Sequence, residues 1–163
     1  MTKLTKITTI ILTITIFGAS SLFADGWIVS PDTLPQRASA LIKSVYPDAQ
    51  IWKVERKFKK KQGEIFDVDL SNGASFKFLA NGECINIDGK YNTVPFSALP
   101  QAIVNTIKKS YPDAIVVKMK KQYYGYNLNA INGNGNGNYK VRLNNMMELF
   151  ITADGQLIGQ KFK

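Results

Sequence analysis

The sequence predicts an α+β fold in which two tandem repeats, each a helix followed by an antiparallel meander, form one sheet of roughly eight strands with both helices on one face. Two observations predict this fold. The motif Tyr-Pro-Asp-Ala at 46–49 recurs letter for letter 65 residues later, at 111–114, and internal repetition defines the unit of a fold. In each copy, hydrophobic residues recur every three or four positions before the motif and every second position after it. This change of spacing is typical of a helix followed by strands.

The N-terminal segment 1–24 is predicted to be a Sec-type signal peptide. Lys3 and Lys6 precede a short apolar run at 7–17, and small residues follow it, as in secretory signals. Cleavage is expected after Ala24. The apolar run of 11 residues is short of the ~20 that a membrane-spanning helix needs, so an anchor is the less favoured interpretation. The sequence therefore indicates a periplasmic or secreted protein with no membrane span once the signal is removed.

Composition restricts the chemistry of the mature chain. Removing Lys3 and Lys6 leaves 19 of the 21 basic residues against 12 acidic ones, and this positive balance favours acidic partners, anionic surfaces or simple solubility. Cys84 is the only cysteine, and histidine is absent. These counts exclude Ser-His and Cys-His nucleophile pairs and disfavour a zinc site with the usual ligands. We expect no catalytic residues, no metal, no cofactor and no enzymatic activity.

The first repeat is predicted to span residues 25–90 and to begin with a helix. Leu-Pro at 34–35 opens this helix, because proline is accepted in a first helical turn. Apolar side chains recur at helical spacing over 38–45 and form one apolar face. The helix is expected to end before Pro47, since the residue before a proline is disfavoured in the α region.

Four strands are expected to follow the first helix. From Ile51 apolar and charged residues alternate, which places successive side chains on opposite faces of a sheet. Trp52, Val54 and Phe58 are expected on the core face, as is Met119 in the second repeat. An Asn-Gly pair between two strands is a strong signal for a hairpin turn, and a single glycine also favours one. The turns between these strands are expected at Gly63, Asn72-Gly73 and Asn81-Gly82.

The second repeat is predicted to span residues 91–163. Leu-Pro at 99–100 opens its helix, and alternating strands follow the second motif. Residues 125–137 add a Gly/Asn-rich insert to its first hairpin, and these residue types favour turns. Beyond the insert the offset between the copies becomes 73 residues, which aligns Cys84 with Leu157. A buried, inert thiol is therefore the favoured interpretation of Cys84.

The order of these motifs resembles the PepSY-like family of β-lactamase-inhibitor-like proteins. The shared features are Leu-Pro, an apolar helix, Tyr-Pro-Asp-Ala, alternating strands, an Asn-Gly turn and an Asp-Gly turn, and they cover nearly the whole mature chain twice over. The resemblance implies a fold like that of the β-lactamase inhibitor protein. It implies no catalytic residues, because the family has no agreed ones. It also implies an exported protein that inhibits an enzyme or binds another periplasmic component.

The uncovered face of the predicted sheet is the expected binding surface, because helices pack on the other face. In the first repeat Asp67 and Asp69 lie between lysine-bearing strands, which can neutralise them. In the second, Lys140 and Arg142 occupy the equivalent positions, so we expect an uncompensated positive strip there. Tyrosine and arginine are frequent in binding hot spots. The candidate partner-binding residues are Lys53, Asp67, Asp69, Lys118, Lys120, Tyr123, Tyr124, Tyr126, Lys140 and Arg142.

Binding of a protein partner is the leading interpretation, and the protein is then a non-enzymatic exported binder, such as an inhibitor of a periplasmic enzyme. The alternative is a periplasmic protein that binds or senses a small ligand or an anionic envelope polymer. A solvated face with no partner is a third interpretation, because any soluble sheet needs charged outer residues. Nucleic acid is disfavoured, since Phe58 is the one aromatic residue in the basic run 57–61 and is expected in the core. The identity of the partner and the oligomeric state stay open.

Overall fold

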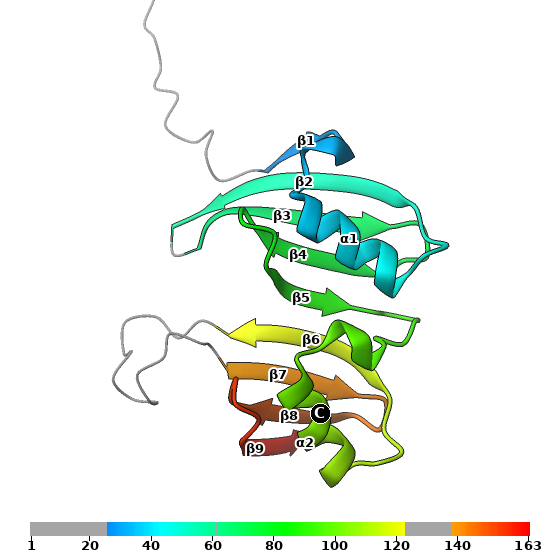
Figure 1. The fold of residues 1–163 in the computed structure, drawn as a ribbon, viewed down its shortest axis with the longest axis vertical. Coiled ribbons are helices and arrows are strands. Elements are labelled where there is room, and N and C mark those ends of the chain that lie inside the picture. Colours follow the sequence, from blue (N-terminus) through cyan, green and yellow to red (C-terminus); the bar gives the residue numbers. More distant parts are fainter. Residues whose placement is uncertain (1–25, 61, 123–137) are drawn as a thin grey trace, which may run out of the picture.

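The computed structural model describes residues 26–60, 62–122 and 138–163, and these parts of the chain form an α+β fold with two α-helices and nine strands (Figure 1). The predicted signal peptide and the Gly/Asn-rich insert lie outside the described residues. All nine strands belong to one antiparallel sheet, in which the spatial order of the strands is their order in the sequence. The predicted α+β class with two helix-plus-meander repeats is therefore confirmed.

The same succession of elements occurs twice: a short 3-10 turn, an α-helix and four strands. In the first repeat these are η1 (Pro31–Thr33), α1 (Gln36–Val45), β2 (Ile51–Lys59), β3 (Gly63–Leu70), β4 (Ser75–Leu79) and β5 (Cys84–Asp88). In the second they are η2 (Phe96–Ala98), α2 (Gln101–Ser110), β6 (Val116–Gln122), β7 (Asn138–Leu143), β8 (Met147–Ile151) and β9 (Leu157–Phe162). Roughly eight strands are expected from the sequence, and the structure has one more, β1 (Trp27–Val29), which pairs with the outer edge of β2.

Both helices begin and end in the same way. Pro35 and Pro100 occupy the N-cap positions in an extended conformation, and a proline there gives up no hydrogen bond, because the first helical N–H groups have no partner within the helix. At the other end the backbone N–H of Tyr46 donates to Ile42 at 2.9 Å, and the equivalent tyrosine of the second repeat does the same. The proline after each tyrosine then stops the helix, as the sequence predicts.

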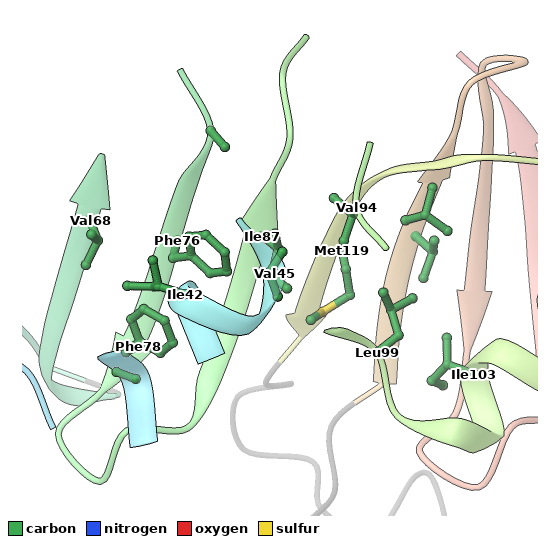
Figure 2. Close-up of a cluster of buried hydrophobic side chains, with 14 of the residues drawn as sticks. Ile42, Val45, Val68, Phe76, Phe78, Ile87, Val94, Leu99, Ile103 and Met119 are labelled. Carbon is green, nitrogen blue, oxygen red and sulfur yellow. The ribbon is translucent and has the colours of Figure 1, made fainter. Parts of the chain in front are cut away.

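One hydrophobic core lies between the helices and the sheet face that they cover. Figure 2 shows Ile42 of α1 lying against the aromatic side chains of β4 and Val45 beside Ile87 of β5. The rings of Phe76 and Phe78 are stacked with their centroids 5.6 Å apart, and burying such a side chain contributes about 1.5–3 kcal/mol. Met119 is buried and continues the cluster into the second repeat (Figure 2), so its predicted core position is confirmed. Because both helices lie on the same face (Figure 1), the opposite face of the sheet stays open.

Two predicted core positions are wrong. Trp52 is 81% exposed, because the β2–β3 register shifts between Ile51 and Lys53 and leaves Trp52 as the extra residue of a bulge. Phe58 is 65% exposed, because it lies one residue from the end of β2, where the β2–β3 hairpin extends past α1 (Figure 1). Its register partner is Glu64, which keeps it on the helix side of the sheet and away from the open face.

Candidate functional site

The open face of the sheet contains a hollow of about 590 Å³ that spans strands of both repeats. Its lining, within the described residues, includes seven basic and two acidic side chains. Ile65 of β3 lines it on the side of the first repeat, Ile85 and Asn86 of β5 line it where the two repeats meet, and cations of β6 and β7 line it on the side of the second repeat. We name this site the hollow and define it by Ile65, Ile85, Asn86, Lys118, Lys120 and Lys140.

Asn86 lies in the part of the hollow where the two repeats meet. The repeats are joined by the β5–β6 pairing, in which Asn86 is directly opposite Lys120. On its other side Asn86 is opposite Lys77 of β4. The residue as a whole is only 7% exposed. Its side-chain amide has no hydrogen-bond partner within the described parts of the chain and is accessible from the hollow. An accessible amide without a partner is a candidate contact for a ligand.

The acidic strand of the first repeat is neutralised by its neighbours, which confirms that part of the sequence interpretation. Asp67 on β3 accepts hydrogen bonds from Lys57 on β2 at 2.9 Å and from Lys77 on β4 at 2.6 Å. Asp69 is paired with Lys53 at 3.2 Å. Burial alone would raise the pKa of Asp67, but the two lysine ammonium groups outweigh it and lower that pKa. Asp67 is therefore a fixed anion in a network of ion pairs.

The positive charges of Lys140 and Arg142 in the second repeat are compensated by a carboxylate of the same chain. The prediction of an uncompensated positive strip is therefore wrong. Both side chains donate to Glu148 on β8, Lys140 at 2.8 Å and Arg142 through Nη2 at 2.9 Å. Glu148 is only 1% exposed. Its burial would raise its pKa, yet the two cations reverse the effect and hold the pKa at about 2. The hairpin register places Glu148 opposite Arg142, and a search for cross-strand pairs in the sequence could have found this contact.

On the open face an ion pair also joins one repeat to the other. Lys118 of β6 pairs with Asp88 of β5, and the two residues are register partners. Burial of Asp88 opposes its ionisation, but the bonds from Lys118 and from the backbone N–H of Lys90 lower its pKa. Sequence reasoning missed Asp88, because nothing in the chain indicates which strands of the two repeats become neighbours.

The structure brings together part of the predicted set of site residues. Lys118, Lys120, Lys140 and Arg142 line the hollow. Lys53, Asp67 and Asp69 lie on the same open face but nearer the β2 side of the sheet. Tyr123, Tyr124 and Tyr126 lie outside the described residues, so their part of the prediction stays a prediction. The site residues that sequence reasoning did not select are Lys77, Asn86, Asp88 and Glu148.

The described residues offer little for catalysis or metal binding. No group of three or more His, Cys, Asp and Glu side chains within them could hold a metal ion. The thiol of Cys84 donates to the backbone oxygen of Asn86 at 3.5 Å, and burial raises its pKa to about 12. Because the thiolate is the nucleophilic form, this thiol is a poor nucleophile. Nor do the described residues include a helix of the length and apolarity that crossing a membrane requires.

Comparison with known proteins gives one matching family. The family model described as "Putative beta-lactamase-inhibitor-like, PepSY-like" matches residues 26–65 and 64–159. No curated protein matches the sequence.

Solved structures of several Bacteroides proteins are similar to this chain. A "putative periplasmic protein" of Bacteroides vulgatus is 24% identical, with a TM-score of 0.70 over 88% of this chain and 99% of that one. A "putative calcium-regulated periplasmic protein" of Bacteroides thetaiotaomicron is 24% identical, with a TM-score of 0.68 over 83% and 96%. A second Bacteroides vulgatus protein, described as "of unknown function", is 22% identical, with a TM-score of 0.69 over 83% and 98%. These similarities show a common fold.

Proposed function

The chain belongs to the PepSY-like, β-lactamase-inhibitor-like family, and from this premise we propose that it is an exported, non-enzymatic protein that binds a protein partner with the open face of its sheet. Inhibition of a periplasmic enzyme is one form that such binding can take. Export to the periplasm is supported by the signal-like segment 1–24 and by the descriptions of the three similar structures as periplasmic. The absence of histidine from the sequence and the high pKa of the Cys84 thiol support a role without catalysis.

The observation that carries this function is the hollow on the face that no helix covers. Three of its charged side chains are held in place, since Lys118, Lys140 and Arg142 are each bound to a carboxylate of this chain. Ordering a free lysine or arginine at an interface costs about 0.5–1.5 kcal/mol. A face on which several charges are already ordered avoids part of that cost, which favours recognition over a purely solvating role.

The lining of the hollow favours a macromolecular surface over a small apolar ligand. Sites for small ligands are lined mostly by apolar and aromatic side chains. Here Ile65 and Ile85 are the apolar lining residues within the described chain, and the others are polar or charged. A polar, positively charged surface of this kind is suited to the polar surface of another protein.

The test compares two double substitutions that change the net charge equally. Lys59→Glu with Lys120→Glu reverses exposed charges on the open face, and Lys43→Glu with Lys109→Glu does so on the exposed sides of the helices. A protein captured from the envelope by the wild type would be purified and titrated against all three forms by calorimetry. We expect the open-face variant to lose affinity about tenfold or more and the helix-face variant to stay within about twofold. Equal losses in both variants would contradict binding at the open face.

Binding of an anionic envelope polymer or small anion is a second candidate, favoured by the excess of seven basic over two acidic side chains around the hollow. Titrations with anionic glycans and anionic vesicles at low and high salt distinguish the two candidates. Polymer binding would weaken steeply with salt and need no protein partner. A specific protein complex would keep most of its affinity at physiological salt.

A further inference from the structure

Lys120 is a cation of the hollow without a carboxylate partner within the described residues. It is exposed on β6 and directly opposite Lys140 of β7. Lys140 is held by Glu148 at 2.8 Å, and Lys118, on the same face of β6, is held by Asp88. Lys120 therefore adds a positive charge beside two cations whose counter-charges are already engaged. Because like charges opposite each other destabilise a sheet, a carboxylate placed beside Lys120 would stabilise the site.

The amide of Asn86 is a second and independent feature of the same place. The residue is more than nine-tenths buried as a whole, but its amide is accessible from the hollow and has no hydrogen-bond partner among the residues described. Its register partner on β6 is Lys120. The two N–H groups of an asparagine amide are donors, and a ligand oxygen above Asn86 would accept from one of them. An ammonium group and a directional donor thus lie side by side, which is the pair of contacts that a carboxylate needs.

From these two features we propose that Asn86 and Lys120 together bind one carboxylate of an acidic segment of the partner protein. This rests on the proposed function and names the chemistry of the partner. Lys120 supplies the charge, and the Nδ2 group of Asn86 supplies a directed hydrogen bond. Because the two residues belong to different repeats, the site exists only when β5 and β6 are paired.

One carboxylate fits the charge balance of the hollow better than a polyanion does. A polyanion gains affinity by replacing the counterions of many cations. Among the lining cations, Lys77, Lys118 and Lys140 are each already bound to a carboxylate of this chain. Within the described residues, the lining cations that have no carboxylate are Lys59 and Lys120. A Glu or Asp side chain on a segment of otherwise neutral residues matches this balance.

The test uses an octapeptide of Gly and Ser with one central Glu and blocked ends, and the matched peptide with Gln in place of Glu. Each is titrated into the isotope-labelled full chain while NMR follows the side-chain amide signals of Asn86. We expect the Glu peptide to shift these signals in a saturable way and the Gln peptide to leave them unchanged. Lys120→Ala should weaken peptide binding about fivefold or more, and Asn86→Asp should weaken it further by charge repulsion. Lys43→Ala, which removes an exposed charge from α1, should leave the affinity unchanged within about twofold.

Three outcomes would overturn the carboxylate site. The first is equal binding of the Glu and Gln peptides. The second is equal affinity of Lys120→Ala and Lys43→Ala, and since Lys120 is exposed, this comparison holds even if Asn86→Asp fails to fold. The third is the same Asn86 shift at equal or lower concentrations of inorganic phosphate, or of phosphatidylglycerol vesicles, which would make the hollow a site for anions in general or for lipid.

Failure of this site and failure of the proposed function give different results. If the charge-reversed open-face variant loses the captured protein while the Glu peptide does not bind, the open face recognises its partner through other contacts. In that case only the carboxylate site is overturned. If instead the Glu peptide binds as expected but no envelope protein depends on the open face, the proposed function fails and the hollow is an isolated carboxylate site.

Discussion

Asn86 of β5 and Lys120 of β6 are register partners in the strand pairing that joins the two repeats. This pairing contains three pairs of opposite residues, whereas the β2–β3 pairing contains eight and the β6–β7 pairing contains six. The geometry of the hollow therefore depends on a short ladder and on the side chains that reinforce it. The ion pair of Lys118 with Asp88 is in the same ladder.

We predict that Lys118→Ala lowers the free energy of unfolding by about 0.5–1 kcal/mol. The pair is partly exposed, so water recovers much of what the mutation removes. The same substitution at Lys109, an exposed residue of α2, serves as the control and should change stability by less than about 0.5 kcal/mol. Urea unfolding at neutral pH measures both. A Lys118→Ala variant as stable as the control would mean that this ion pair does not reinforce the ladder.

Glu148→Gln is predicted to lower stability by about 2 kcal/mol at neutral pH, because it removes the negative charge of a buried carboxylate that accepts hydrogen bonds from Lys140 and Arg142. The pKa of Glu148 in the folded protein is held at about 2 by Lys140 and Arg142, below the ordinary value of 4.5 for a glutamate. A lowered carboxyl pKa contributes stability that is fully present above the unfolded pKa and is lost as pH falls through the folded one. The gap between wild type and variant should therefore be constant above about pH 5 and shrink between about pH 4.5 and 2.

The measurement is urea unfolding at several pH values from 7 to about 2. Asp113→Asn removes an exposed carboxylate and controls for the change in net charge. A stability gap between wild type and Glu148→Gln that does not shrink in acid would show that the charge of Glu148 is not what stabilises this hairpin.

Cys84 is predicted to react slowly with thiol reagents in the folded protein. Burial raises its pKa to about 12, so at pH 8 its thiolate fraction is about a thousandfold below that of a thiol with a pKa near 9. Labelling with an alkylating reagent, followed by mass spectrometry, gives the rate. The rate should rise sharply when urea unfolds the chain. A folded-state rate equal to that of free cysteine would contradict the buried, protonated thiol.

Trp52→Ala is predicted to be tolerated in spite of the size of the side chain. Because Trp52 is an exposed bulge residue, its loss should cost less than about 1 kcal/mol. Phe76→Ala, which empties a position in the centre of the core, should cost about 3–5 kcal/mol. Thermal unfolding of the two variants compares the losses directly. Similar losses would mean that Trp52 packs against the body of the protein.

The sequence was sufficient to predict the repeats, the helices and most turns, because each follows from a local signal. The Asn-Gly turn, for example, places Gly73 at a φ of 85°, a conformation that glycine adopts without a side-chain clash. The exposure of Trp52 was not predictable, since a bulge shifts the register without changing the alternating pattern that precedes it.

The candidate site was less predictable than the fold, for two physical reasons. Alternation along a strand gives the face on which Glu148 lies, but its burial depends on the cations that surround it. The contact of Asn86 with the second repeat depends on which strands of the two copies become neighbours. No local pattern carries that information.

The arrangement of strands in sequence order has a consequence for how the chain is made. Strands pair only with the strands that are next to them in the sequence, so the contacts of the sheet are mostly local and folding can proceed stepwise from the N-terminal end. Until β6 has been synthesised and has paired with β5, however, the outer edge of β5 has unpaired backbone groups to which another strand can bind. At high local concentration that edge can take up β6 of a second molecule, and domain-swapped dimers are then the characteristic misassembled product of this architecture.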